Sequence, residues 1–428
     1  MANKPALLAI LFGFGAIFWQ LVLRDAIYNG AGLGRKVQPI SDFPYRCHRI
    51  SGDPNIQACE DMWLDQKSRT LYLACSDSLA RKQWMPNIHR LNVSGRALND
   101  HVVAMDIDHP NGQGGYTYSV LKTPGFPGVH GDGRMHVVGM TGTTSADGSK
   151  TQVWLVNAKP SVNTQTGELL DNAVAGANST IEVFEIRPGS DSMVHLRTYA
   201  DSQIATPNNV AVVEDGGFFF TNDHGPHKAG WQHHLSSFIG TGDVSYCSSA
   251  GACKKVAHGF KFPNGLHFSS DGLLYVPSAA IGGITVFRPK PDGSVLRVHF
   301  IDLDYPIDNL SEDSIGDIYA AALPKGMQAL AAFEDPLNPK SAPAAVWRIR
   351  RLNRDVADTY KYELTKVIED AEGVLLPGTT TCVHDAKTGR LFLSGELSRR
   401  DEILVLSYVT QLTPAGVVSP FITVCERD

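Results

Sequence analysis

The chain has 428 residues and a formal net charge of −6, from 44 acidic and 38 basic residues. This balance argues against a protein that binds nucleic acid through non-specific phosphate contacts, since such proteins are normally basic. Hydrophobic residues make up 43% of the chain and charged residues 19%, which excludes a chain that is disordered throughout. With 40 glycines and 24 prolines, many short strands joined by turns are expected, and long helices are not expected beyond the N-terminus.

An uncharged, strongly apolar stretch covers residues 5–23, between Lys4 and Arg24. As a helix it is about 28 Å long, close to the thickness of the hydrocarbon layer of a bilayer. Signal peptides have shorter apolar regions and a small-residue cleavage site, and no convincing site follows residue 23. We predict an uncleaved signal-anchor helix, with a cleaved signal peptide and a buried core helix as alternatives. Residues 1–40 are then the anchor and linker, and residues 41–428 form one domain.

Two features predict that the body of the protein belongs to the secretory pathway, either as a membrane-anchored lumenal or extracellular domain or as a secreted one. Asn92 and Asn178 begin Asn-x-Ser/Thr triplets, which are acceptors of N-linked glycans. The second feature is the set of seven cysteines, of which the first and the last lie at the two ends of the folded body. They are Cys47, Cys59, Cys75, Cys247, Cys253, Cys382 and Cys425.

Two pairs of cysteines are close enough in sequence to staple hairpins. Cys247 and Cys253 flank a five-residue loop, and Cys59 and Cys75 lie at the two ends of one strand-turn-strand segment. Cys382 falls inside an apolar strand and is expected to be the unpaired cysteine. Spacing alone does not determine the pairing, and seven reduced cysteines in a cytosolic protein are the alternative.

A weak internal repeat runs through the chain beyond residue 40. Each copy has a polar residue, alternating apolar positions, a turn with Asp or Gly, and a compact apolar run, which is typical of two strands joined by a tight turn. The spacing leaves room for two further strands per copy, and four-stranded units at this period are typical of a β-propeller. We therefore predict an all-β fold, a six-bladed β-propeller, with a β-sandwich as the alternative. The copies begin near residues 61, 130, 209, 264, 309 and 381.

Polar residues recur at the start of these copies, where the inner strand of each blade would meet the mouth of the central channel. Nearly all of them offer carboxylate or amide oxygens, the donors that Ca²⁺ prefers, whereas Zn²⁺ prefers His and Cys. Capping of turns by Asn and Asp is the alternative explanation. The set comprises Glu60, Asp61, His130, Asn208, Asn209, Asn264, Asp308 and Asn309, with Asn222, Asp223 and His224 at the end of one inner hairpin. A nearby group of histidines, His224, His227, His233 and His234, is interpreted as a solvated loop near the channel mouth rather than a metal site.

Several of these segments together resemble the paraoxonase (arylesterase/lactonase) family, whose members are six-bladed calcium propellers of the secretory route. The resemblance runs from about residue 43 to residue 428, with insertions. Its motifs are residues 221–224 (Thr-Asn-Asp-His), residues 259–265 (Gly-Phe-Lys-Phe-Pro-Asn-Gly), Asp308-Asn309 followed by Gly316-Asp317, the pair Glu60-Asp61, and the two terminal cysteines.

The resemblance implies two calcium ions and a catalytic histidine. It assigns the catalytic Ca²⁺ to Glu60, Asn222, Asn264, Asp308 and Asn309, and a second, structural Ca²⁺ to Asp61, Asp223 and a backbone carbonyl near Asp132. It also matches His130 to the general base, and Cys47 and Cys425 to a disulfide between the first and last strands. The sequence departs from the family at Ala158, where a second histidine is expected, and near Ala322, where a free cysteine is expected.

The function that follows from the resemblance is calcium-dependent hydrolysis of carboxylic esters or lactones. Ca²⁺ would polarise the carbonyl and stabilise the oxyanion, while His130 or a carboxylate activates water. The expected partners are a small-molecule ester or lactone and, through the N-terminal segment, the membrane; no nucleic acid is expected. One alternative is a single-metal propeller of the gluconolactonase or strictosidine synthase type, using Glu60, Asn208 or Asn209, Asn264 and Asp308. Another is a non-catalytic propeller that binds a lipid or protein partner.

Overall fold

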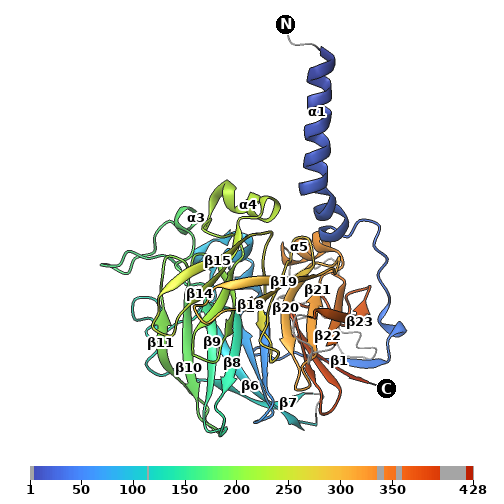
Figure 1. Ribbon diagram of the computed structural model, residues 1–428. Helices are drawn as coiled ribbons and strands as arrows, with labels where there is room; N and C mark the ends of the chain where they lie inside the picture. The colour runs from blue at the N-terminus through green and yellow to red at the C-terminus, as the bar shows by residue number, and fades with distance from the viewer. Residues whose placement is uncertain (1–3, 113–114, 335–341, 353–358, 396–420, 428) are drawn as a thin grey trace, which may run out of the picture.

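The computed structural model describes residues 4–112, 115–334, 342–352, 359–395 and 421–427, and it confirms a six-bladed β-propeller. Six antiparallel four-stranded sheets stand around a central axis, and the inner strand of each sheet packs against those of the two neighbouring blades (Figure 1). Side chains on the two faces of each sheet alternate, so both faces are covered by the adjacent blades. The hydrophobic core is therefore divided into clusters that lie between blades.

The strands of each blade, from the innermost outward, are as follows. Blade 1 has β2 (Asp61–Asp65), β3 (Thr70–Cys75), β6 (His101–Pro110) and β7 (Tyr116–Leu121), and blade 2 has β8 (Val137–Thr144), β9 (Thr151–Asn157), β10 (Thr180–Ile186) and β11 (Met193–Tyr199). Blade 3 has β12 (Pro207–Val212), β13 (Phe218–Asn222), β14 (Gly242–Cys247) and β15 (Cys253–Phe260), and blade 4 has β16 (His267–Phe268), β17 (Leu274–Pro277), β18 (Ile284–Pro289) and β19 (Val295–Ile301). Blade 5 has β20 (Ile307–Glu312), β21 (Ile318–Ala322), β22 (Ala344–Leu352) and β23 (Lys361–Asp370), and blade 6 has β24 (Thr381–Asp385), β25 (Arg390–Ser394), β26 (Phe421–Arg427) and β1 (Tyr45–Ser51).

Five of the six predicted repeat copies coincide with the inner hairpins of blades 1, 3, 4, 5 and 6. The copy expected at residue 130 is displaced, because the inner strand of blade 2 begins only at Val137. The preceding residues form a loop in which His130, Gly131 and Gly133 all have positive φ angles. That conformation is incompatible with a strand, so the prediction was wrong for this copy.

Blade 6 closes the propeller, because its outermost strand, β1, comes from the start of the domain and its other three strands come from the end. Cys47 and Cys425 lie directly opposite each other on β1 and β26 and form a disulfide, as predicted. The bridge closes 378 residues of sequence, for which chain entropy gives a stabilisation of about 5 kcal/mol. The other two predicted disulfides, Cys59–Cys75 and Cys247–Cys253, are also formed, and Cys382 is a buried free thiol.

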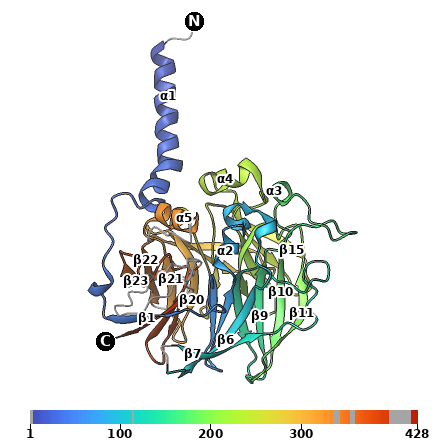
Figure 2. The same cartoon turned by 180° about the vertical axis from the view of Figure 1, so that it is seen from behind.

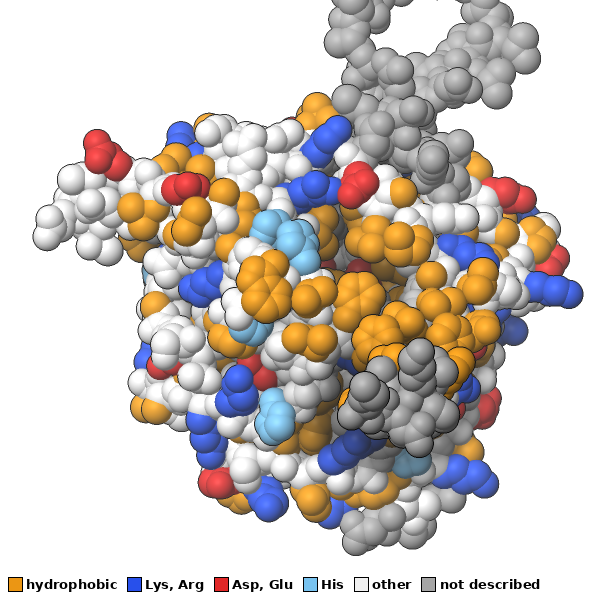
Figure 3. Space-filling view, turned by 90° about the horizontal axis from the view of Figure 1, so that it is seen from above, with side chains coloured by type: hydrophobic (Ala, Val, Ile, Leu, Met, Phe, Trp, Pro, Cys, Tyr) orange, Lys and Arg blue, Asp and Glu red, His pale blue; other side chains and the backbone are white. Residues whose placement is uncertain are grey.

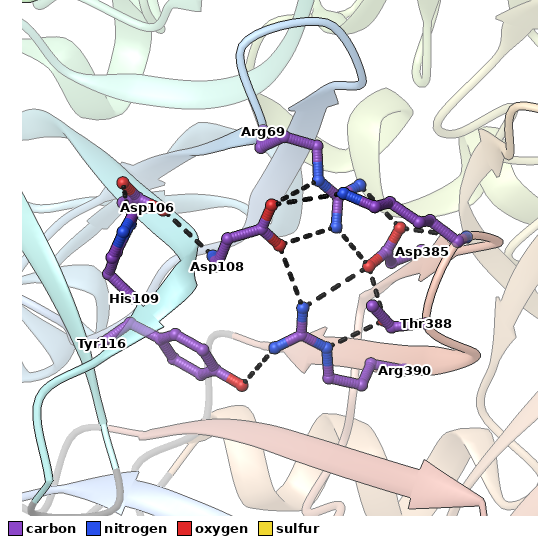
Figure 4. Close-up of polar contacts among 9 residues, drawn as sticks. Arg69, Asp106, Asp108, His109, Tyr116, Asp385, Thr388 and Arg390 are labelled. Atoms are coloured by element: carbon purple, nitrogen blue, oxygen red, sulfur yellow. Dashed lines mark hydrogen bonds and ion pairs between the residues drawn. The ribbon is translucent and has the colours of Figure 1, made fainter.

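An ionic cluster joins blade 1 to blade 6 (Figure 4). Arg69, in the turn between β2 and β3, donates to both oxygens of the buried Asp385 carboxylate at 2.7 and 2.6 Å. Its guanidinium also donates to Asp108 at 3.0 and 2.9 Å, and Arg390 approaches both carboxylates. The disulfide thus closes blade 6 itself, and a planar guanidinium that bridges two acids fastens blade 6 to blade 1.

The short helices and the short strand pair β4 (Trp84–Met85) and β5 (Arg90–Leu91) are extensions of the loops between strands. The helices are α2 (Ser78–Arg81), α3 (Asn172–Ala175), α4 (Gly230–Ile239) and α5 (Gly326–Glu334). Figures 1 and 2 show α3, α4 and α5 at the end of the propeller from which the N-terminal helix rises.

The N-terminal helix stands away from the propeller (Figures 1 and 2). It begins with α1 (Lys4–Phe18) and continues through wider turns at Trp19–Leu23 and Ala26–Gly30. The span Leu11–Gly30 is long and apolar enough to cross a membrane, judged by length and composition. The helix therefore ends at Gly30, seven residues beyond the apolar stretch of residues 5–23.

Candidate metal centre at the floor of an apolar cavity

Three of the six inner strands share a backbone irregularity that sets the geometry of the site. In β8, β12 and β20 a register shift places two consecutive residues opposite one residue of the next strand, which is a β-bulge. The bulged pairs are 138–139, 208–209 and 308–309, and residues 60–61, 264–265 and 380–381 take the same place in the other blades. The two members of each pair point to different levels of the channel, so the propeller carries two rings of six residues.

The first members form the upper ring, and all six of them line one cavity. They are Glu60, Val138, Asn208, Asn264, Asp308 and Thr380. The cavity has a volume of about 330 Å³ and opens on the face that carries α4 and α5. Figure 3 shows hydrophobic side chains gathered around a hollow on this face, with histidines beside it. The floor is therefore polar, whereas most of the wall is apolar, as is usual in small-molecule sites.

The oxygen donors of the upper ring are buried and their hydrogen bonding is incomplete. Asn208 is 3% exposed and Asn264 is 4% exposed, and within the described part of the chain the Oδ1 atoms of both amides have no hydrogen-bond partner. A buried carbonyl oxygen without a partner costs about 1–3 kcal/mol, so two such oxygens at one level of one cavity are suited to accept from an electropositive ligand. Glu60 and Asp308 add two buried carboxylates to this level. Two amides and two carboxylates form a donor set that fits Ca²⁺.

The second members form a lower ring whose side chains are bonded to one another. Asn209 donates to Asp61 at 2.8 Å and to Asn309 at 3.0 Å, and Asn309 donates to Thr381 at 2.9 Å. Asp61 also accepts the N–H groups of residues 62 and 140, and burial raises the pKa of its carboxyl group. Gly139 and Gly265 complete the ring, and a Cβ on Gly265 would lie 1.9 Å from Asn309 Oδ1. The polar side chains of the lower ring are therefore hydrogen-bonded to one another, and the ring supports the oxygen donors of the upper ring.

Three of the five residues implied for the catalytic ion, Glu60, Asn264 and Asp308, lie together in the upper ring. Asn309 does not, since it belongs to the lower ring, where it donates to Glu60 Oε1 at 3.2 Å. Asn309 therefore supports the Glu60 carboxylate and does not itself line the cavity floor.

Asn222 also lies away from the cavity. Its Oδ1 accepts the N–H groups of Ala205 and Thr206 at 3.1 and 3.0 Å, and its Nδ2 donates to Gln203 and Asp243. Its amide oxygen and nitrogen are therefore used to join β13 to the loop before β12 and to β14. Asn208 takes its place in the upper ring. The ring therefore offers Glu60, Asn208, Asn264 and Asp308, the donors expected for the single-metal alternative.

The three residues implied for a second ion are not brought together. Asp61 is in the lower ring, and Asp223 lies beside the wall, where it accepts from Asn87 at 2.5 Å and from His224. Asp132 is exposed and caps its own loop by accepting the N–H groups of residues 129 and 134. The described residues contain no group of three His, Cys, Asp or Glu side chains placed to hold a metal ion, and the upper ring has only two such residues.

His130 is not at the site either. It is exposed on the loop before β8 and packs against Gly167. His136, whose backbone carbonyl accepts the N–H of Ala158 at 2.8 Å, is buried beside a small separate void, and burial lowers the pKa of its imidazole to about 4. Neither side chain lines the cavity above the ring.

Four other histidines line the cavity: His89, His224, His233 and His234. His224 is buried and lines the cavity, and its Nδ1 lies 2.7 Å from Asp223 Oδ1. Its ring stacks on His233, with centroids 3.6 Å apart, and burial together with the neighbouring histidines lowers the pKa of His233 to about 2. The expectation of a solvated histidine loop was therefore wrong for these two residues. The sequence signal was available, because Asp223-His224 directly follows an inner hairpin.

The fold and the site define a class: a six-bladed propeller with a ring of buried oxygen donors at the floor of an apolar cavity. The Arylesterase family profile matches residues 160–399, more than half of the chain, so the chain belongs to the arylesterase family. It is 29% identical over 223 residues to serum paraoxonase/arylesterase 1 of Mus musculus, a match that covers 51% of this chain and 58% of the relative. It is 30% identical over 213 residues to serum paraoxonase/arylesterase 2 of Gallus gallus, covering 49% and 57%. The matched segment thus spans little more than half the length of these relatives.

A solved structure of a gluconolactonase from Xanthomonas campestris is similar at 15% identity and a TM-score of 0.46, covering 95% of this chain and 93% of that one.

The predicted glycan acceptors Asn92 and Asn178 are both exposed, and their glycosylation stays a prediction.

Proposed function

We propose that this protein is a calcium-dependent hydrolase of carboxylic esters or lactones, with one ion at the upper ring. The observation that carries the proposal is the pair of partnerless oxygens on Asn208 and Asn264 beside two carboxylates. Membership of the arylesterase family supports ester hydrolysis as the reaction. When bound there, Ca²⁺ would supply Lewis acidity towards a carbonyl oxygen, and two neutral amide ligands leave more of its charge available than four carboxylates would.

The chain itself supplies the general base and the surroundings for the reaction. The Asp223 carboxylate accepts the Nδ1–H of His224, which fixes the tautomer and leaves Nε2 as the proton acceptor. His224 Nε2 takes a proton from the attacking water, and the resulting imidazolium is stabilised by the adjacent carboxylate. The apolar wall holds the acyl group and excludes other water molecules from the reacting carbonyl.

A histidine comparison tests the proposal. We expect wild-type protein with calcium to hydrolyse phenyl acetate or a δ-lactone, and His224→Gln to lower kcat by 10²-fold or more with little change in KM, since a general base contributes about 10²–10⁴-fold. His130→Gln is the matched control and should behave as wild type, because His130 is exposed outside the cavity. Absence of hydrolysis by the wild type contradicts the enzyme proposal. A fully active His224→Gln variant contradicts only the assignment of His224 as the general base.

The three disulfides are consistent with the secretory pathway, and we further propose that the domain is anchored at a membrane surface. The apolar helix rises from the face of the propeller that carries the cavity mouth (Figure 1). On that face Trp231, Ile239 and Met327 expose large apolar side chains. An anchor with this geometry would hold the cavity mouth towards the lipid.

A further inference from the structure

We infer that residues 24–36, here called the strap, form one wall of the substrate cavity and select substrates by the size of their acyl group. This inference rests on the proposed function and deepens it. These residues were predicted to be part of a linker between anchor and domain, which would leave them without fixed contacts to the propeller. The structure instead packs them against blades 4 and 5.

The strap contributes three residues to the cavity lining, Ala26, Gly30 and Ala31. Its backbone approaches the propeller as closely as a glycine permits. A Cβ on Gly30 would lie 2.4 Å from the carbonyl oxygen of Ala280, and a Cβ on Gly326 would lie 2.5 Å from the carbonyl oxygen of Gly30. This fit leaves no space for solvent between the strap and the start of α5.

Two basic side chains fasten the far end of the strap. Arg35 donates to the carbonyl oxygen of Pro324 at 2.6 Å and to that of Asp304, and its guanidinium lies 4.2 Å from the centre of the Tyr305 ring. Lys325 reaches back from the propeller and donates to the carbonyl oxygens of Gly32 and Arg35, at 2.7 Å each. Charge-assisted bonds in both directions hold the strap in one position.

The composition of the wall indicates what the strap selects. The strap offers only small side chains to the cavity, whereas the propeller contributes large apolar ones, among them Phe238, Phe262 and Phe333. The space next to Ala26 and Ala31 is therefore where an apolar acyl chain of several carbons fits above the polar ring. A short acyl group needs only the floor, so the strap should affect long-chain esters selectively.

The test fills the cavity from the strap side. We expect Ala31→Phe, and independently Ala26→Phe, to lower the ratio of kcat/KM for phenyl decanoate over phenyl acetate by at least tenfold in the full-length protein. Leu33→Phe is the matched control on the same strap, since Leu33 is 61% exposed and is absent from the lining, and it should leave the ratio unchanged. A ratio unchanged in both alanine variants overturns the inference. Two variants keep the test decisive when one of them does not fold.

A binding measurement separates this inference from the proposed function. Decanoic acid titrated calorimetrically into the protein should bind at least tenfold more weakly to Ala31→Phe than to wild type, and equally to Leu33→Phe and wild type. This result would support the strap as a cavity wall even for a protein that hydrolysed neither ester. Equal affinity for all three proteins, or no binding to the wild type, would overturn it.

Discussion

Replacing Asp308 with alanine is expected to reduce the hydrolysis of phenyl acetate by about 10³-fold, because the substitution removes one of the two carboxylates of the upper ring. The remaining donors would be Glu60 and the amides of Asn208 and Asn264, which together carry a single negative charge. A divalent ion held by so little charge is bound weakly, and its loss removes the group that stabilises the oxyanion. Initial rates at a calcium concentration just sufficient to saturate the wild type measure the effect.

Two further proteins make the Asp308 experiment decisive. Asn208→Ala should cause a comparable loss, since it removes a donor of the same ring. Asp191→Ala removes an exposed carboxylate bonded to Lys122 and should leave the rate unchanged. An Asp308→Ala variant with the activity of the wild type would show that the reaction does not take place at this ring.

Replacing Arg69 with methionine is expected to lower the free energy of unfolding by about 3 kcal/mol, because it leaves the buried Asp385 carboxylate without its main partner. The free energy of unfolding of Arg69→Lys should fall between those of the wild type and Arg69→Met, since an ammonium group cannot bridge both oxygens of the carboxylate. Lys122→Ala is the matched control: the Lys122–Asp191 pair has the same 2.6 Å separation but exposed side chains, so its loss should cost less than about 1 kcal/mol. Urea unfolding at constant calcium measures all four proteins.

The effect of Arg69 should depend on pH in a defined direction. Burial alone would raise the pKa of Asp385, but hydrogen bonds from Arg69 and Thr388 outweigh it and hold the pKa at about 2. A lowered pKa in the folded state means that the stabilisation is complete above about pH 4 and is lost as the pH falls towards 2. The difference between wild type and Arg69→Met should therefore shrink from pH 7 to pH 3. A constant difference would show that Asp385 does not depend on Arg69 for its ionisation.

The propeller was predictable because its signals are local. Alternating apolar residues around a turn with Asp or Gly mark a hairpin wherever they occur, and five of six inner hairpins carry them. Blade 2 was misplaced because its ring positions hold Val138 and Gly139, which give no polar mark, while His130 lies seven residues before the strand. The disulfides were predictable for the same reason, since each short pair spans one hairpin.

The site was only partly predictable, because a bulge decides which of two adjacent residues faces the cavity. Asp308 and Asn309 are neighbours in sequence, yet one lines the cavity and the other belongs to the scaffold. Periodicity cannot resolve this, since a one-residue shift exchanges the two faces of a strand. Asn222 was misassigned for another reason: four hydrogen bonds to distant backbone and side-chain groups occupy its amide. The strap carried no sequence pattern, because its role depends on Lys325 and other residues almost three hundred positions away.

Calorimetric titration of calcium into chelator-treated full-length protein, followed by an assay of phenyl acetate hydrolysis on the same sample, tests the central claim most directly. One ion should bind per chain and restore the activity that the chelator removed, because the described residues assemble one ring of oxygen donors and leave Asp61, Asp223 and Asp132 apart. Full activity in protein that has been stripped of calcium, or a protein that binds no calcium, would contradict the account.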